Sequence, residues 1–302
     1  MSTDPIPLPQ AAHVQTIDRL GALLVAGSAI AWSMGGMIDR FIVAPDTWAV
    51  IFWRSVWAAS FLSVFLLVRD GRNAVGAFRS MGWPGLVVAL CFMTASVSFV
   101  LAIAYTTVAN VILINAAVPL VAALIARVFL GEFISGATWA AIAAVIAGVA
   151  IMVSDGTGET GSIIGILLAL LITFVFAIAT VVTRRSNVRM TPAVITATTL
   201  AAIVASTQVS SFAVSGQDMA WLFAFGALNL GLGMALFVAG ARLIPSALAA
   251  LLGTLETVLG PVWVWLVHGE KATSLTIIGG TIVVAALVSH LVVTNRPKTV
   301  SG

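Results

Sequence analysis

The chain is a succession of apolar runs of about 20 residues joined by short polar segments. About 20 apolar residues are needed for a helix to cross the roughly 30 Å hydrocarbon core of a bilayer. The composition agrees, because 61% of the 302 residues are hydrophobic and 8% are charged, against about 25% charged in soluble domains. We therefore predict an all-α polytopic membrane protein with ten transmembrane helices, near residues 18–38, 48–68, 83–104, 108–130, 134–153, 161–182, 192–214, 219–240, 246–267 and 273–293.

The basic residues between these runs predict the orientation of the chain. An even number of spans places both termini on one side of the membrane, and the opposite side has only Arg40 and Lys271. By the positive-inside rule, residues 1–17 and 294–302 are then cytoplasmic tails, and we expect the inner membrane of a bacterium. Eleven basic residues lie on the predicted cytoplasmic side: Arg19, Arg69, Arg72, Arg79, Arg127, Arg184, Arg185, Arg189, Arg242, Arg296 and Lys298.

The sequence also contains an internal repeat. NAAVPLVAALIARVFLGE at 115–132 is matched by GTLETVLGPVWVWLVHGE at 253–270, and the segments 20–40 and 164–184 also align. We therefore predict two five-helix halves, 18–154 and 161–293, and their odd number of spans makes the second half inverted. Inverted repeats are typical of secondary transporters with a substrate site near the midplane; the alternative is a duplicated scaffold without transport. The second alignment pairs Gly21 with Gly165, Trp32 with Phe176 and Arg40 with Arg184.

Several short motifs resemble the drug/metabolite transporter superfamily, in particular its EamA-type ten-helix members. They are Gly131-Glu132, Gly269-Glu270, Pro119, Glu256 and AIAWSMGG at 29–36 followed by Asp39-Arg40. The family usually has proline directly after the ninth-span glutamate, whereas here Thr257 follows and the proline is Pro261. The resemblance implies a basket of ten helices with a central cavity drawn from spans 1, 3, 4, 6, 8 and 9. It also implies export of amino acids or other small metabolites, and the branch resembled is that of the YddG-like amino-acid exporters.

Two charged residues lie inside predicted spans. A charge at membrane depth costs at least about 2.5 to 3.5 kcal/mol on insertion scales, so such residues are usually paired, protonated or cavity-facing. Glu256 lies near the middle of the ninth span, where it is a structural carboxylate bonded to a neighbouring helix, a proton-coupling site, or a contact for a substrate amine. Arg54 in the second span is long enough to reach water, and it is a candidate charge partner of Glu256 if these two spans face each other.

Polar and aromatic residues form stripes along three of the spans. Cys91, Thr94, Ser98 and Tyr105 share one helical face, and comparable stripes run through Trp32 and through Phe176 and Thr180 in their own spans. Such faces suit a cavity with a few polar groups, although small and hydroxyl residues also let helices pack closely in lipid. The predicted cavity residues are Trp32, Thr94, Ser98, Tyr105, Asn115, Phe176, Thr180, Asn229 and Glu256.

Motifs for catalysis are absent from the sequence. It has no HExxH zinc helix, no GxSxG elbow and no Walker phosphate loop, so we expect no enzyme, metal site or cofactor, and the basic residues indicate topology rather than nucleic-acid binding. The sequence predicts a secondary transporter that exports small neutral or zwitterionic metabolites, with amino acids as the first candidates, by alternating access. A passive channel or facilitator for small amphiphilic solutes and a drug or nucleoside exporter are the alternatives. The expected partners are the solute, the bilayer and, if Glu256 titrates, protons.

Overall fold

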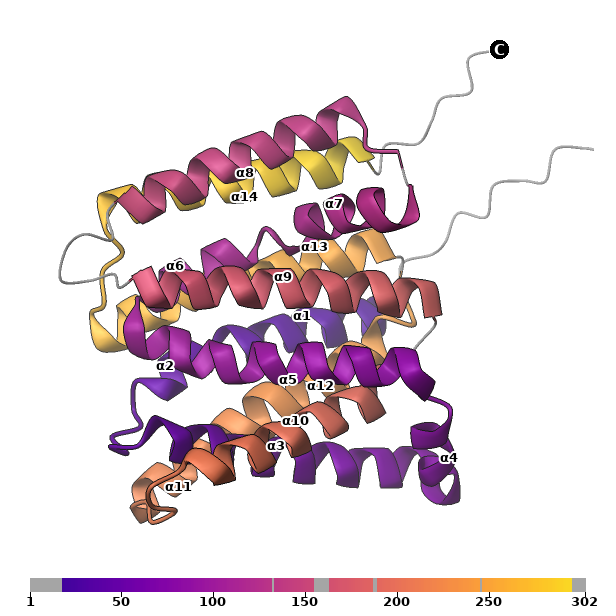
Figure 1. Cartoon of the computed structure of the whole chain (residues 1–302), viewed down its shortest axis with the longest axis vertical. Helices are drawn as coiled ribbons and strands as arrows, with labels where there is room; N and C mark the ends of the chain where they lie inside the picture. Colours follow the sequence, from indigo (N-terminus) through magenta and orange to yellow (C-terminus); the bar gives the residue numbers. More distant parts are fainter. Residues whose placement is uncertain (1–17, 132, 155–162, 187–188, 245, 295–302) are drawn as a thin grey trace, which may run out of the picture.

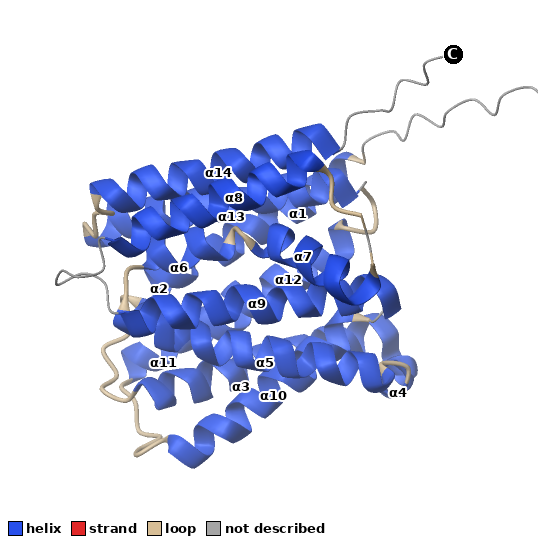
Figure 2. Ribbon diagram, turned by 45° about the horizontal axis from the view of Figure 1, so that its top comes forward, coloured by secondary structure: helices blue, strands red, loops and turns tan. Residues whose placement is uncertain are grey.

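The computed structural model describes residues 18–131, 133–154, 163–186, 189–244 and 246–294. Glu132 and nearly all of both predicted tails lie outside these ranges. Every regular element in the described part is a helix (Figure 2). The elements are α1 (Arg19–Ser33), α2 (Gly35–Asp39), α3 (Thr47–Asp70), a 3-10 turn (Gly71–Asn73), α4 (Ala74–Arg79), α5 (Gly82–Tyr105), α6 (Val108–Asn115), α7 (Val118–Leu130), α8 (Gly136–Ser154), α9 (Ile163–Ser186), α10 (Met190–Gln208), α11 (Gly216–Phe223), the π-helix η2 (Ala224–Leu232), α12 (Gly233–Gly240), α13 (Ser246–His268) and α14 (Ser274–Thr294).

The ten predicted spans agree closely with these helices. Seven stretches are long and apolar enough to cross a membrane: 19–39, 47–79, 82–105, 108–130, 163–186, 190–208 and 216–240. The helices α8, α13 and α14 account for the other three predicted spans. The all-α fold class is therefore confirmed.

One predicted boundary is wrong, because the seventh span ends at Gln208 rather than at residue 214. The amide of Ser210 donates to the carboxylate of Asp46 (2.7 Å), and Trp53 Nε1 donates to the carbonyl of Phe212 (3.0 Å). These hydrogen bonds hold the segment after α10 against α3, so its backbone groups find partners outside a helix. The pKa of the Asp46 carboxyl lies below its usual value, mainly because the Ser210 amide donates to it.

Three of the continuous apolar runs are interrupted helices. The first span consists of α1 and α2, the fourth of α6 and α7, and the eighth of α11, η2 and α12. Pro119 stands at the start of α7, where a missing backbone N–H costs nothing. Pro261, by contrast, lies inside α13 without ending it.

The packing of the helices follows the internal repeat. The helix α1 packs against α13 and α12, while its counterpart α9 packs against the fourth span (α6 and α7) and against α5. In the same way, α10 packs against α5 as α3 packs against η2. The pairs α3 and α10, and α8 and α14, are each formed by two counterparts, as expected on a two-fold axis. Figure 1 shows these two pairs at opposite edges of the bundle.

Glycines let the peripheral helices α8 and α14 approach closely. A β-carbon at Gly148 would lie 2.7 Å from the carbonyl oxygen of Gly279, and a β-carbon at Gly279 would collide with the carbonyl of Gly148. Small residues at a helix crossing allow backbones to meet in lipid, where van der Waals packing stabilises the contact. The α8–α14 pair therefore depends on two glycines from different halves.

We predict that Gly148→Leu lowers the melting temperature of the purified protein, because overpacking of a closely packed site costs about 1–3 kcal/mol. Gly136 at the start of α8 is the matched control, since a β-carbon there would meet no atom within 4 Å. Thermal unfolding followed by tryptophan fluorescence measures both variants. Equal melting temperatures for Gly148→Leu and Gly136→Leu would contradict the proposed role of the glycine contact.

Candidate functional site

The bundle has two ends that differ in their packing. The end at which α1 begins and α14 ends is called here the termini side, and the opposite end, with α2 and the start of α6, the far side (Figure 1). The candidate site has two parts: a group of residues that closes the far side, and the residues on the interior face of α13.

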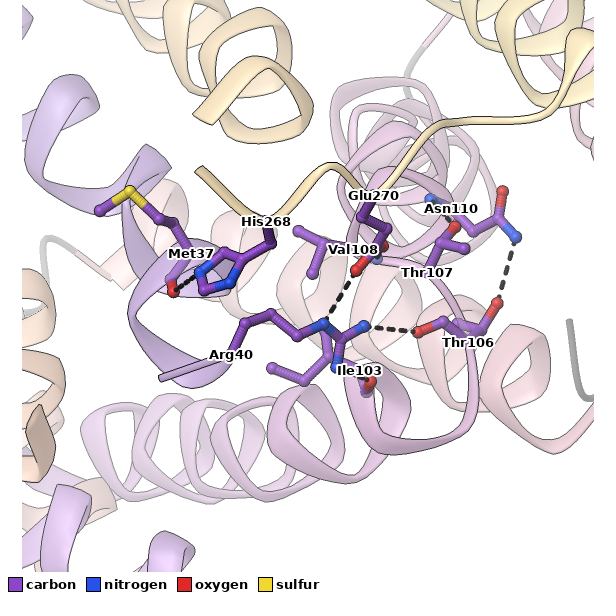
Figure 3. Close-up of polar contacts among 9 residues, drawn as sticks. All are labelled: Met37, Arg40, Ile103, Thr106, Thr107, Val108, Asn110, His268 and Glu270. Atoms are coloured by element: carbon purple, nitrogen blue, oxygen red, sulfur yellow. Dashed lines mark hydrogen bonds and ion pairs between the residues drawn. The ribbon is translucent and has the colours of Figure 1, made fainter. Parts of the chain in front are cut away.

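An ion pair between Arg40 and Glu270 forms the centre of the far-side closure (Figure 3). Arg40 Nε donates to Glu270 Oε2 at 2.9 Å, and the backbone amide of Val108 donates to Glu270 Oε1 at 3.1 Å. Arg40 Nη1 also donates to the carbonyl of Ile103 at 2.9 Å. This group, called the far-side clasp, joins the ends of α2 and α13 to α5 and α6.

A second set of hydrogen bonds extends from the clasp to α14. Asn110 Nδ2 donates to Thr106 Oγ1 (3.1 Å), and Thr276 Oγ1 donates to Asn110 Oδ1 (2.9 Å). Arg40 Nη2 lies 3.5 Å from the carbonyl of Thr106. Both polar groups of the Asn110 side chain are therefore used, and this buried residue connects α14 to the clasp (Figure 3).

The aromatic residues beside the clasp close the same end against α11. A ring nitrogen of His268 lies 3.0 Å from the carbonyl oxygen of Met37. The ring of Phe41 stacks on Trp221 at 4.3 Å between centroids and meets the His268 ring edge-on at 4.5 Å. The far side is thus closed by stacked rings as well as by the ion pair.

Glycines bring the backbones together directly beneath the clasp. A β-carbon at Gly36 would collide with Val108, and one at Gly260 would collide with Ile112. The same added atom at Gly260 would also lie 3.7 Å from the carbonyl oxygen of Ser33. The helices α2, α6 and α13 therefore leave no room for a larger residue at these contacts.

The break between α1 and α2 is stabilised by side chains of the second half. Asn229 Nδ2 donates to the carbonyls of Ala31 (2.7 Å) and Trp32 (3.0 Å), and Trp263 Nε1 donates to Ser33 Oγ (3.0 Å). A helix interruption in lipid frees backbone groups that must be satisfied by other parts of the protein. Asn229, a predicted cavity residue, supplies this hydrogen bonding from the π-helix η2.

The break between α6 and α7 has a similar arrangement. Pro119 provides no amide for the preceding turn. The hydroxyl of Thr173 in α9 lies 3.3 Å from the carbonyl oxygen of Ile114, while its shorter hydrogen bond is to the carbonyl of Ala169 in its own helix at 2.9 Å. Asn115, the last residue of α6, has a buried Oδ1 with no hydrogen-bond partner in the described part of the chain. An unsatisfied acceptor at a helix break is a candidate for binding a donor from solvent or solute.

Glu256 lies on the face of α13 that points into the bundle. Gly260, one turn further along, contacts Ile112, whereas the exposed residues Leu255, Val258 and Trp265 occupy the other side of the helix. The carboxylate is half-buried. Within the described ranges no residue donates a hydrogen bond to it, so the charge has no protein partner in this conformation.

On the termini side α7 departs from α13, whereas α1 stays packed on α13 through Val25, Ala249 and Leu252. The helix α13 packs against α6 in the far half, but the main partner of α7, which continues the fourth span, is α9. A β-carbon at Gly253, one turn from Glu256 on the termini side, would meet no atom within 4 Å. The interior face of α13 is thus tightly packed at Gly260 and open at Gly253.

Arg54 is buried away from Glu256. Its Nη1 donates to Ser96 Oγ at 2.9 Å, and its guanidinium lies 4.3 Å from the centroid of the Phe225 ring. These partners come from α5 and η2, so the structure does not bring Arg54 to Glu256 as a charge partner. Its Nε is buried without a hydrogen-bond partner among the described residues.

The predicted stripe residues of α5 and α9 mostly bond within their own helices. Thr94 Oγ1 donates to the carbonyl of Leu90 (3.0 Å), and Thr180 Oγ1 donates to that of Phe176 (2.8 Å). The Phe176 ring packs edge-on against Phe92 at 5.1 Å. Local bonds of this kind satisfy a hydroxyl in a helix, so the use of these residues in a cavity stays a prediction.

The remaining predicted residues lie at different depths. Trp32 packs against Phe237 at 5.5 Å and against Gly233, and its Nε1 is buried without a partner among the described residues. Ser98 is buried, whereas Tyr105 is 50% exposed at the far end of α5. The structure therefore does not gather all nine predicted residues into one place.

The clasp residues were not among the predicted site residues. The sequence did point to Arg40, which has a counterpart in the repeat, and to Glu270, which ends a Gly-Glu motif. Their pairing across the chain, and the use of the Val108 amide, follow only from the tertiary packing.

The fold defines the class of the protein: an integral membrane protein built from two inverted five-helix repeats. The sequence model of the EamA-like transporter family matches residues 19–154 and again residues 163–291. The chain belongs to this family, a transporter family within the drug/metabolite transporter superfamily and not a class of enzymes.

Comparison with solved structures supports the same fold. A chain described as "Crystal structure of protein" aligns with a TM-score of 0.65 and 16% identity, over 91% of this chain and 98% of that chain. At this identity the likeness shows the fold alone. No curated protein matches the sequence.

We predict that Asn229→Ala destabilises the protein, because it removes the side-chain donor shared by the carbonyls of Ala31 and Trp32 at the break between α1 and α2. The expected cost is about 1–3 kcal/mol, the range for a buried polar group left unsatisfied. Leu228→Ala is the matched control, since Leu228 is the preceding residue and is 43% exposed. Thermal unfolding of both variants is the measurement, and a melting temperature of Asn229→Ala at or above that of Leu228→Ala would contradict the prediction.

Proposed function

We propose that this transporter is a secondary carrier that moves small neutral or zwitterionic metabolites, with amino acids as the first class to test, by alternating access. The observation that supports this most strongly is the one-sided closure of the bundle. The far side is held by Arg40, Glu270 and the Val108 amide, whereas the face of α13 at Gly253 is open. A carrier needs such a closed end and a means of opening it.

The repeat supplies a candidate for the opposite conformation. Residues 18–154 and 161–293 are proposed as the two halves that move, and the sequence repeat relates Arg40 to Arg184 and Glu270 to Glu132. In our proposal the segment around Arg184 belongs to the closure of the termini side in the opposite conformation, when the far-side clasp opens. Inverted repeats are known to exchange conformations in this way around a site near the midplane.

The substrate class is proposed from the charges of the interior. Glu256 is a half-buried carboxylate without a protein partner in the described part of the chain, and it suits a substrate amine. Trp32 offers an aromatic surface, and the unpartnered Asn115 Oδ1 offers an acceptor. A small solute with an ammonium group and an apolar part fits these features.

The direction of transport is proposed from the charge distribution. The excess of arginine on the termini side supports cytoplasmic termini in a bacterial inner membrane. The conformation closed at the far side then opens toward the cytoplasm, where an exporter loads its substrate.

Transport itself is tested in proteoliposomes. We expect saturable uptake of labelled amino acids, accelerated by unlabelled substrate on the opposite side, because a carrier exchanges solutes through a single site. A passive channel shows flux without such counterflow. No saturable flux for any of a panel of amino acids and amphiphilic drugs would contradict the proposal.

We predict that Arg40→Gln and Glu270→Gln each open the far side more often. Loss of a partly buried ion pair worth about 1 kcal/mol changes the equilibrium about fivefold. The measurement is the rate at which a membrane-impermeant maleimide added from the far side labels a cysteine placed at Gly253, in a chain whose native Cys91 is replaced by serine.

Arg69→Gln is the matched control for this experiment. Arg69 also forms an ion pair with a carboxylate, Asp70, at 2.7 Å, but at the termini end of α3. Labelling that rises equally in the Arg69 and Arg40 variants, or in neither, would contradict the role of the clasp.

We predict that Glu256→Gln raises the KM for amine-bearing substrates at least several-fold, because the charge opposite the ammonium group is lost. Asp18→Asn, which changes an acid to its amide at the N-cap of α1, should leave the KM unchanged. Flux measured from pH 5 to 9 distinguishes proton coupling from substrate binding. If Glu256 couples transport to protons, the Glu256→Gln variant also loses the pH dependence of the flux. An unchanged KM and an unchanged pH profile in that variant would reject both roles.

A further inference from the structure

A groove of about 410 Å³ lies along the outer surface of α13 at the far side. Its walls come from α13, from the start of α6, from the residues after α13 and from α14. The lining residues used below are Ala109, Pro261, Trp265, Glu270, Lys271, Ala272 and Ile277. We call this feature the α13 groove.

The length of the α13 groove matches one leaflet of a bilayer. The lining extends from Pro261, in the middle of α13, to Lys271, just after the helix ends. The helical part, from Pro261 to His268, rises about 11 Å at 1.5 Å per residue, and three further residues continue the lining to Lys271. The groove is therefore comparable in length with half of the roughly 30 Å hydrocarbon core. An acyl chain whose glycerol lies at the membrane surface would therefore end near Pro261.

The lining of the groove suits a hydrocarbon chain. Small residues, Ala109 and Ala272, leave space between the helices, and Trp265 and Ile277 are 53% and 56% exposed. The indole of Trp265 lies on the side of α13 facing away from Glu256. The groove thus faces the surrounding lipid and not the interior of the bundle.

The charges at the mouth favour an anion. Glu270 lines the groove, but its two carboxylate oxygens already accept hydrogen bonds from Arg40 and Val108. Lys271 is exposed and has no hydrogen-bond or ion-pair partner among the residues that the structure describes. The free charge at this end of the groove is therefore positive, at the level where lipid phosphates lie.

We propose that the α13 groove is a binding site for one anionic glycerophospholipid of the far-side leaflet, with an acyl chain between α13 and α14 and the phosphate at Lys271. One basic residue near a membrane surface raises the affinity for an anionic lipid about fivefold over that for a neutral lipid. The apolar walls of the groove pack against the acyl chain of the lipid. This site does not depend on the identity of the transported solute.

The site lies directly behind the far-side clasp. Glu270 belongs to both features, and Ala109 is the neighbour of Val108, whose amide bonds to Glu270. A chain lying in the groove contacts α6 and α13 together, next to the residues that bond to Arg40 and Glu270. Bound lipid is therefore expected to stabilise the closed far side.

The test uses delipidated full-length protein in detergent, titrated with dioleoyl phosphatidylglycerol or dioleoyl phosphatidylcholine and followed by native mass spectrometry. Ile277→Trp places a larger side chain in the groove. Ile278→Trp is its matched control, because Ile278 is the adjacent residue of α14, is 51% exposed and does not line the groove. Lys271→Gln removes the charge, and Lys271→Arg retains it.

We expect the wild type, Ile278→Trp and Lys271→Arg to bind one phosphatidylglycerol about fivefold or more tightly than phosphatidylcholine. Ile277→Trp should lose this tight site, and Lys271→Gln should lose the preference for phosphatidylglycerol while still binding a chain. Melting curves without lipid establish that each variant is folded.

Four results would overturn the proposal. The first three are equal lipid binding by Ile277→Trp and Ile278→Trp, an unchanged lipid preference in Lys271→Gln, and a dimer of the chain that occludes the groove in place of lipid. The fourth is a rise in the melting temperature of the wild type with inorganic phosphate as large as that with phosphatidylglycerol, because the acyl chain would then contribute nothing.

Discussion

The need to satisfy backbone hydrogen bonds in lipid is the constraint on which the arrangement of this protein depends. Two of its spans are interrupted in the first half, and at each interruption a polar side chain from the second half reaches a backbone carbonyl: Asn229 donates at the end of α1, and the Thr173 hydroxyl lies against the carbonyl of Ile114 in α6. In the hydrocarbon region, backbone groups at a helix break must be satisfied by the protein or by a cavity that the protein encloses. The second half therefore meets the first through polar contacts at the points where the first-half helices are interrupted.

The two halves differ in where their helices are interrupted, although their sequences form a repeat. The counterpart of the interrupted first span, α9, is continuous, and the ninth span keeps its helix through Pro261. The interruptions lie beside the far-side clasp, and glycines such as Gly36 and Gly260 bring the same helices into contact there. The far side is consequently closed by many short-range contacts, whereas α7 and α13 separate toward the termini side.

The free-energy cost of burying a charge is offset in different ways for the charged residues of the bundle. Arg54 lies against an aromatic ring and a serine hydroxyl, and Arg40 and Glu270 neutralise each other. Glu256 alone among these four faces the bundle interior without a partner in the described residues. This difference supports a role for Glu256 in binding a solute or a proton, while the other three are explained by packing and closure.

The sequence by itself determined the number of spans, most of their boundaries and the repeat, because apolar length and helical periodicity are local properties that the bilayer thickness fixes. It also identified Arg40, Glu256 and Glu270 as unusual residues, and the family match to both halves confirms the repeat architecture. Only the tertiary structure decided that Arg40 binds Glu270, that Asn229 bonds to the end of α1 and that Arg54 lies away from Glu256. These outcomes depend on which helices meet and at what height, and no local pattern in a chain of apolar helices specifies that.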